Sequence, residues 1–583
     1  MLRKIVYFSL SFFVFAMFSN GCKGKMKTVG GTLNIHESAD PDMLNPINLS
    51  SANARRLADI MFSTMLGQEP AGNFDLKPYL LKERAKITEI TEGEFAGGMK
   101  LEMEIKEDAK WDNGTPITGH DYVFTVKAIL NPKTNCENLK GYFDWVGDIV
   151  VDSANPKKIT IYSNKKHFQI EENAGGYVIP EYNYDAEQIM RKFAMRDFNT
   201  KDKINALKTN QDIIKFATHF NSEKFQRDPK FIVGSGPYML EKWTTGQEVV
   251  LKRKENWWGD KYASERDFWA FPKRIKVKII NDNNTAFTAL KDGQLDNYCA
   301  IPAKDFKELE KNDKFLQNFN LNKVDRLTYS FIGLNTRNEK LKDVNVRKAL
   351  AHAVNRDKIN EILAFGESKK TESFVHNTQP HYNKDLKEYE FNINKSIELL
   401  EASGWKDTDG DGIRDKVLNG RKTPLEITFK YSKDENTKNQ ALIIQEDFKK
   451  AGIKLLMVEK EWTVFLQDLD KFDFEMYPVG FTMSPTMSNP KQQWHTSSAV
   501  PGGSNNVGWG NAASDQLIED IISDLNVDSR REKYKKLQKM IHDDVPVIFM
   551  YNSINRIATK KTFNVEKIMI SPGVRYNEFE LVK

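Results

Sequence analysis

The sequence predicts a large α/β protein, and three observations lead to this. Helix and strand patterns alternate along the chain, Gly and Pro separate it into three blocks, and 40% apolar with 29% charged residues in 583 is an ordinary globular composition. The sequence shows no internal repeat or low-complexity linker. With 86 Lys and Arg against 81 Asp and Glu, the net charge is too small to suggest a nucleic-acid partner.

Residues 1–21 are predicted to be a signal peptide. Arg3 and Lys4 precede an apolar run that is too short to span a bilayer. The following Ser-Asn-Gly-Cys resembles a lipoprotein processing site, in which Cys22 becomes the lipidated first residue. Residues 22–30 would then be the lipidated cysteine and its tether, and the chain from Cys22 keeps a net charge of +3. We expect a protein in the cell envelope, held on the periplasmic or extracellular face by its lipid alone.

Two further cysteines, Cys136 and Cys299, remain in the exported chain. An oxidising compartment permits a disulfide between them, but their spacing cannot show whether the two side chains meet. Both the paired and the unpaired state stay open at this point.

The first half of the chain contains clear local patterns. A strand is predicted at 32–37, a helix from about Asn53, and a second strand at 99–105, where apolar and charged residues alternate. Asn113-Gly114 supplies a tight turn after that strand, with Trp111 covering its end. Thr118 is the predicted N-cap of a helix that runs through Leu130.

The second half alternates between strands and helices. Strands are predicted at 248–253, 275–279, 427–431, 453–457 and 472–476, and helices at about 343–354, at 396–404 and before 451. The helix near 350 places Val346, Leu350, Ala353 and Val354 on one apolar face. A loop from Val479 to Pro490 is predicted to follow the last strand.

Several of these segments, in this order, resemble the family 5 extracellular solute-binding proteins, the oligopeptide- and dipeptide-binding receptors of bacterial ABC importers. They include the strand and turn ending KEDAKWDNG, Gly-Ser-Gly-Pro-Tyr at 234–238, the helix around Lys342–Asp357, and SIELLEASG at 396–404. The resemblance implies a two-lobed clamp of the type II periplasmic-binding-protein class, with an extra domain that makes three domains in two lobes. Domain I would comprise 31–66, 179–287 and 551–583, domain II 67–178, and domain III 288–550.

The resemblance also implies the function. A monomer would bind an oligopeptide or modified peptide between its lobes and deliver it to the permease subunits of an ABC importer, without a cofactor. Two alternatives stay open, an oligosaccharide or other uncharged ligand on the same fold, and a surface lipoprotein with no transport role. The ligand-binding positions implied by the family are Trp462, Gly480, Phe481, Ser484, Ser50, Ser51, Tyr142, Trp145 and Tyr551.

The predicted ligand loop departs from the family in its charge. Peptide receptors of the family place an Asp there to bind the ligand's α-ammonium, whereas this chain has no acidic residue between Glu475 and Asp515. An ammonium buried without a counter-charge is costly. Either another lobe supplies a carboxylate, or the ligand lacks a free ammonium. The loop alone favours the second alternative, in which unmodified di- and tripeptides bind poorly and N-terminally blocked ligands bind better.

One acidic loop could bind a metal. Asp407, Asp409, Asp411 and Asp415 occupy the first, third, fifth and ninth positions of an EF-hand-type pattern, but Leu418 stands where the bidentate Glu is required. Asp-Gly repeats also form turns readily. A calcium loop and a plain structural turn are therefore both open, and the turn is favoured.

Catalysis is not expected. The nine histidines form no HExxH motif and no cluster with cysteine, and Gly-Ser-Gly at 234–236 lacks the spacing of a nucleophile elbow. The sequence therefore predicts a binding protein and not an enzyme.

Overall fold

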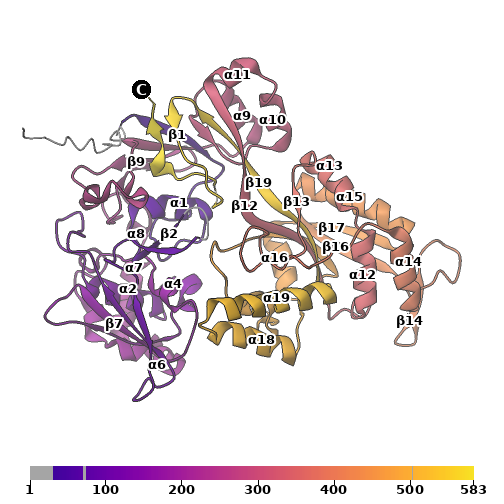
Figure 1. The fold of residues 1–583 in the computed structure, drawn as a ribbon, viewed down its shortest axis with the longest axis horizontal. Helices are drawn as coiled ribbons and strands as arrows, with labels where there is room; N and C mark the ends of the chain where they lie inside the picture. The colour runs from indigo at the N-terminus through magenta and orange to yellow at the C-terminus, as the bar shows by residue number, and fades with distance from the viewer. Residues whose placement is uncertain (1–29, 70–73, 502, 571, 583) are drawn as a thin grey trace, which may run out of the picture.

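The computed structural model describes residues 30–69, 74–501, 503–570 and 572–582, and it shows a two-lobed α/β protein (Figure 1). One mixed sheet extends through both lobes in the order β17-β16-β18-β12-β19-β11-β1-β10-β9-β8, with β13 paired to β19. The predicted fold class is confirmed. Among the described residues, every helix is too short or too polar to cross a membrane.

The first lobe is built around β1 (Thr32–Glu37), which is parallel to both of its neighbours. The other strands of this half of the sheet are β10 (Arg274–Ile279), β11 (Asn297–Tyr298), β9 (Glu248–Arg253) and β8 (Tyr238–Thr244). The C-terminal strands β20 (Phe563–Asn564) and β21 (Glu580–Leu581) return beside it, and the Leu581 side chain lies against Gly30. Both ends of the described chain therefore lie in the same lobe.

A second sheet in this lobe contains the strand with the clearest sequence pattern. Its order is β4 (Lys86–Glu89), β5 (Met99–Glu104), β7 (Lys158–Ser163) and β6 (Val146–Val151). Burial alternates along β5 as its apolar and charged residues do. Helix α2 (Gly119–Leu130) begins at Thr118, whose backbone N–H donates to Asp121 at 2.9 Å. Trp111 is buried at the strand end, so these local predictions are confirmed.

Two long antiparallel strands connect the lobes. The chain leaves the first lobe along β12 (Phe319–Leu334) and returns along β19 (Val547–Lys560), diagonally across the molecule in Figure 1. Their register is interrupted between Asp325 and Tyr329 and again before Phe331. Because a bulge bends the strand that carries it, this irregular stretch is where the connection between the lobes can flex.

The second lobe packs helices on the other end of the large sheet. Parallel strands β16 (Glu426–Ser432) and β17 (Lys454–Lys460) are connected by α15 (Glu435–Lys450). The predicted apolar face of α12 (Val344–Ala353) and the residue after it is buried against α14 (Ile393–Ala402) and α15. A hairpin of β14 (Asp415–Leu418) and β15 (Arg421–Pro424) projects from this lobe, and α18 (Ala512–Ser523) packs against α19 (Val527–Asp544).

Shorter elements complete the chain. The remaining strands are β2 (Leu66–Gln68), β3 (Leu76–Pro78), β13 (Lys369–Lys370) and β18 (Met476–Thr482). The remaining helices are α1 (Ala52–Met61), α3 (Glu137–Lys140), α4 (Ile170–Ala174), α5 (Glu181–Tyr184), α6 (Lys201–Ala206), α7 (Gln211–Phe220), α8 (Lys224–Arg227), α9 (Asn283–Lys291), α10 (Ala303–Leu309), α11 (Asp313–Asn318), α13 (Arg356–Ala364), α16 (Trp462–Asp470) and α17 (Lys491–Trp494).

One predicted strand lies at the wrong place. We expected a strand at 472–476 and a loop from Val479, but the strand is β18, at 476–482. Its partner β12 explains the difference, because Thr482 to Met476 pair residue by residue with Thr328 to Leu334. Gly480 and Phe481 therefore lie within a paired strand, and the loop begins after Thr482.

The three-domain division stays a prediction. The segment 288–318 contains β11, α10 and α11, and β11 pairs with β1. This pairing favours a boundary inside β12 over one at 287. Cys22 and the predicted signal and tether up to residue 29 lie outside the described residues.

Candidate functional site

A cavity of about 850 Å³ lies between the lobes. This is the size of a small-molecule or cofactor pocket. The first lobe supplies most of its wall, from α1, β2, β3, the α2 and α3 region, the segment 172–177 and the C-terminal segment 568–577. The second lobe contributes residues 482–485, immediately after β18.

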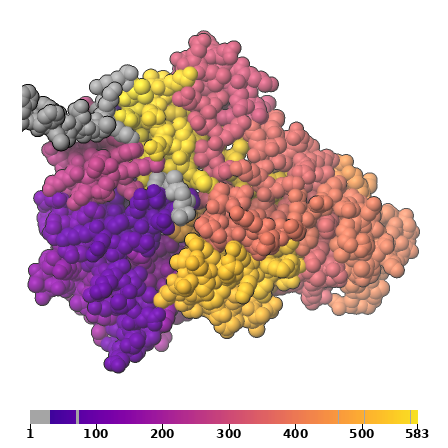
Figure 2. Space-filling view, viewed as in Figure 1, coloured from indigo at the N-terminus to yellow at the C-terminus, as the bar shows by residue number. Residues whose placement is uncertain are grey.

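The two lobes touch beside this cavity. The Phe168 backbone N–H donates to the Ile522 carbonyl oxygen at 3.0 Å, and His167 Nε2 lies 3.3 Å from the amide nitrogen of Asn489. The guanidinium of Arg530 covers the Phe168 ring at 4.5 Å. In the space-filling view the indigo and violet first lobe meets the gold helices of the second (Figure 2). The clamp is therefore in a closed arrangement.

Three of the predicted ligand-binding residues line the cavity, namely Ser50, Tyr142 and Ser484. The backbone N–H and hydroxyl of Ser50 both donate to Asp42 Oδ2 at 2.8 Å, which fixes the residue at the wall. Tyr142 is half exposed, and it lines the cavity together with residues of both lobes. Ser484 comes from the second lobe, so this trio spans the cleft.

Two predicted residues support the wall from behind it. Ser51 is the N-cap of α1, accepting the Ala54 backbone N–H, and its hydroxyl donates to Asp42. Trp145 is only 1% exposed, and its indole N–H donates to the Tyr142 carbonyl oxygen at 2.6 Å. Trp145 is therefore a core residue that holds Tyr142 in place and does not line the cavity itself.

The other four predicted residues lie away from the cavity wall. Trp462 begins α16, where it is 52% exposed. Gly480 pairs with β12, and Phe481 stacks on Phe331 with ring centroids 5.6 Å apart. The Tyr551 hydroxyl donates to the backbone carbonyl of a residue in α13. Gly480 and Phe481 lie within β18 and make their contacts inside the sheet. The sequence did not indicate this strand pairing.

Charged residues in the wall were missed by the sequence analysis. Arg55 and Asp59 stand one turn apart on α1, and the Tyr177 hydroxyl donates to the Asp59 carboxylate. Burial raises the pKa of Asp59, whereas the Tyr177 hydrogen bond and the charge of Arg55 lower it. The spacing of Arg55 and Asp59 shows that they share a helix face, but no motif marks that face as a cavity wall.

The other wall arginines are already paired. Arg56 forms a bidentate ion pair with Glu37, and the Tyr576 hydroxyl donates to the same carboxylate at 2.6 Å. Arg575 donates to Asp267 at 2.9 Å. These pairs balance the charges of Arg56 and Arg575 within the wall.

Glu172 lies at the contact between the lobes. Its Oε1 accepts the Thr486 hydroxyl at 2.7 Å and the Gln68 side-chain amide at 3.4 Å, and its Oε2 accepts the Gln169 amide at 3.3 Å. Burial raises the pKa of Glu172, and the hydrogen bonds from Thr486 and Gln169 offset this only in part. Thr486 belongs to the predicted loop that contains no acidic residue, so a carboxylate of the first lobe reaches it.

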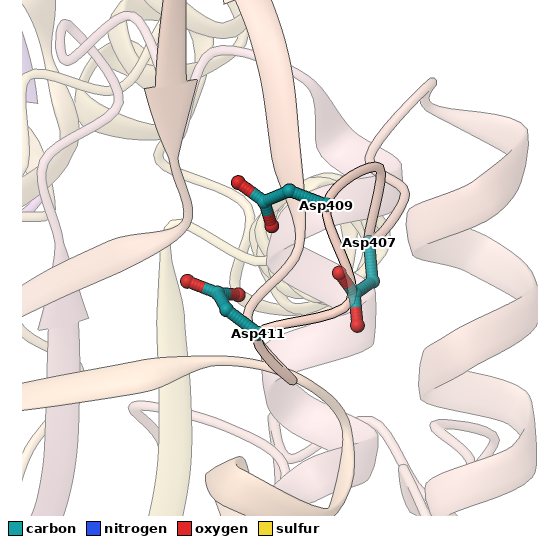
Figure 3. Close-up of side chains that lie close together, drawn as sticks. All are labelled: Asp407, Asp409 and Asp411. Atoms are coloured by element: carbon teal, nitrogen blue, oxygen red, sulfur yellow. The ribbon is translucent and has the colours of Figure 1, made fainter.

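The acidic loop of the second lobe forms an exposed turn. Asp407, Asp409 and Asp411 bring carboxylate oxygens within 4.8 Å of one another (Figure 3). Asp407 accepts the backbone N–H groups of two loop glycines at 2.7 and 3.1 Å, and Asp409 pairs with Lys422 at 2.7 Å. Asp415 accepts the Thr408 hydroxyl and lies 3.3 Å from the same lysine. Asp411 accepts the Ile413 backbone N–H at 2.7 Å, so each of these acids has a partner within the loop or its hairpin.

Cys136 and Cys299 are free thiols. Each donates to the side-chain oxygen of an asparagine at 3.1 Å, Cys136 to Asn48 and Cys299 to Asn297. The unpaired alternative is the one that the structure shows.

Two lobes that are connected by the paired strands β12 and β19, with a cavity between the lobes, define a clamp-type solute-binding protein. Residues 90–502 match the family model described as bacterial extracellular solute-binding proteins, family 5 Middle, and the chain belongs to this family.

Its relatives are binding proteins with different ligands. The chain is 26% identical to the oligopeptide-binding protein AppA of Bacillus subtilis, over 95% of each chain. It is 22% identical to the nickel-binding periplasmic protein of Escherichia coli, over 94% of this chain and 96% of that one. The solved structure of AppA in complex with a nonapeptide has a TM-score of 0.71 and 23% identity, covering 96% of this chain and all of that one. NikZ from Campylobacter jejuni in complex with Ni(L-His) has a TM-score of 0.72 at 22% identity, covering 94% and 99%.

Proposed function

We propose that this protein captures an oligopeptide or a modified peptide in the cavity and delivers it to the permease of an ABC importer. The observation that carries the proposal is the cavity of about 850 Å³ between two lobes that a pair of bulged strands connects. Closure of such lobes buries a ligand and releases it on opening. The peptide-binding relatives named above support the choice of ligand.

The wall suits a peptide main chain. Gly67 and Gly176 both line the cavity, and a residue without Cβ lets a ligand backbone approach closely. Around them, amide side chains from Gln68, Asn138 and Asn173 can hydrogen-bond peptide groups. The charged groups Arg55, Asp59 and Glu172 can meet charged ligand ends, which an uncharged sugar would leave without partners.

The alternatives fit the wall less well. An oligosaccharide would stack on exposed aromatic rings, and the predicted ligand-binding aromatics Trp462 and Phe481 lie outside the wall. A non-transport protein would be favoured by side chains that block the cleft, whereas the cleft holds a cavity of about 850 Å³. A bare transition metal would favour His or Cys ligands, and the described wall contains neither.

Native mass spectrometry of protein purified from its own host tests the proposal. We expect a co-purifying peptide that is released on unfolding. A sugar, a metal complex or a consistently empty protein would contradict it.

The anchor has its own test. We propose that Cys22 carries the lipid and holds a monomer at the membrane surface. A single anchor carries all the membrane affinity, so Cys22→Ser should move the protein into the soluble fraction. If the variant stays with the membrane, another anchor exists.

A further inference from the structure

Glu172 is the wall carboxylate whose charge nothing in the described structure balances. Its three hydrogen-bond donors, Thr486, Gln68 and Gln169, are all neutral. Among the described residues it has no ion-pair partner within 4.0 Å. A carboxylate held in a protein interior without a cation is costly, and a cation that arrives with a ligand relieves that cost.

The other free carboxylate of the wall, Asp59, also has no ion-pair partner within 4.0 Å among the described residues, but arginines act on it electrostatically. Asp59 is one helical turn from Arg55, which acts with the Tyr177 hydroxyl to favour the ionised form of Asp59. Arg56 and Arg575 also act on Asp59 electrostatically. Since arginines act electrostatically on Asp59 and no cation of the described residues acts in this way on Glu172, Glu172 is where a positive ligand group gains most.

Glu172 supplies a negative charge beside a loop that has no acidic residue. Thr486 lies in the segment 476–514, which contains no acidic residue, and its hydroxyl donates to Glu172 from the opposite lobe. An ionised carboxylate offers about four acceptor sites, and three are occupied here. Room remains for a charge-assisted hydrogen bond from a ligand N–H group.

We propose that Glu172 of the first lobe binds the ammonium group of the ligand and, through Thr486, couples that contact to closure of the lobes. The inference rests on the proposed function and narrows its ligand class to peptides with a free amine. The expectation from the loop alone, that free peptides bind poorly, is thereby replaced by its opposite. An open clamp separates Thr486 from Glu172, so ligand and closure stabilise the same arrangement.

A randomised tetrapeptide library, in free and N-acetylated forms, tests this by native mass spectrometry on wild type and Glu172→Gln. A tetrapeptide recovered from the library is then titrated calorimetrically in both forms. Wild type should bind the free form at least about 30-fold more tightly than the acetylated form, since removing one partner of a buried charge pair costs that much. In Glu172→Gln the affinities of the two forms should become nearly equal.

Two matched variants sharpen the result. Asp59→Asn removes the other wall carboxylate, and it should keep the preference for the free form. Thr486→Val keeps the Glu172 charge and removes the contact between the lobes. It should weaken both forms of the peptide by a similar factor while the preference stays.

The outcomes separate the two claims. If wild type prefers the free peptide and Glu172→Gln keeps the whole preference, the assignment of Glu172 is wrong while peptide capture stands. Equal binding of both forms by wild type also overturns the assignment. If wild type binds neither library, peptide capture is wrong and the inference is wrong with it. Thermal unfolding of each variant confirms that a loss of binding is not a loss of fold.

Discussion

The acidic turn at Asp407 and the cavity wall at Glu172 both present carboxylates, and they differ in what balances the charge. At the turn, Asp407 accepts backbone N–H groups and Asp409 pairs with Lys422 in an exposed hairpin. In the wall, Glu172 has neutral donors alone and is enclosed between lobes. A count of acidic residues therefore favours the turn as a binding site, whereas the local charge balance favours the wall.

The largest expected effect comes from filling the wall. Gly176 lines the cavity, and a Cβ placed there meets only the Asn173 carbonyl oxygen, at 3.6 Å, so Gly176→Phe should fold. The ring would occupy ligand space, and peptide affinity should fall by roughly 100-fold or more, since expelling a well-fitted group costs several kcal/mol. Titration calorimetry measures this. Asp409→Asn in the turn is the control and should leave peptide affinity unchanged. A loss of affinity in this variant would instead place ligand binding at the turn.

Acid should open the clamp through the lobe contact. Burial lowers the pKa of His167 to about 4, so the closed form favours the neutral ring. The charged groups that act on this ring are Lys165, Asp144, Glu519 and Lys491. If opening returns His167 to its ordinary pKa of 6.5, closure is fully favoured above that pH and loses up to about 3 kcal/mol as the pH falls from 6.5 to 4.

Small-angle scattering follows this opening as a rise in the radius of gyration. His167→Gln should flatten the pH dependence between 6.5 and 4. A profile that is identical in the two proteins would place the acid response elsewhere.

A smaller effect is expected on stability, and its sign differs between Glu172 in the wall and Asp407 in the acidic turn. Without ligand, Glu172→Gln removes a partly buried charge that has no ion-pair partner among the described residues, so the free energy of unfolding should stay the same or rise by about 1 kcal/mol. Asp407→Asn weakens charge-assisted hydrogen bonds to the turn and should slightly lower the melting temperature. Calorimetric melting checks both, and a clear destabilisation by Glu172→Gln would mean that its charge is already balanced.

The smallest effect is expected from calcium at the turn. Because local partners satisfy Asp407 and Asp409, EDTA should leave the melting temperature unchanged. An ion in excess over its Kd would instead raise the stability by mass action. A calcium-dependent rise in melting temperature would support calcium binding at the turn.

Local patterns in the sequence predicted the fold well where neighbours in the chain decide the structure. The alternation of β5, the Thr118 cap and the apolar face of α12 all follow from adjacent residues. The position of β18 does not follow from adjacent residues, because pairing with β12, about 150 residues earlier, extends the strand through Phe481.

The candidate site was harder to predict, because its residues come together only through contacts between distant parts of the chain. Ser50, Tyr142 and Ser484 were found through the resemblance to the family. Glu172 lies on a five-residue helix with no motif, and only the folded clamp brings Thr486 to it across 314 positions of the chain. Charge balance between lobes depends on tertiary contacts, which a reading of local periodicity cannot supply.

Proton release on ligand binding tests the central claim most directly. Burial in the closed clamp raises the pKa of Glu172, which favours the protonated carboxyl group until a cation arrives. An ammonium that binds there must expel this proton. Calorimetric titrations in mildly acidic solution, in buffers of different ionisation heat, compare His167→Gln with the double variant that also carries Glu172→Gln, because closure would otherwise release a proton from His167 as well. The protein that keeps Glu172 should release clearly more protons per free peptide bound, and equal release in the two proteins, or none when Glu172 is present, would contradict the account.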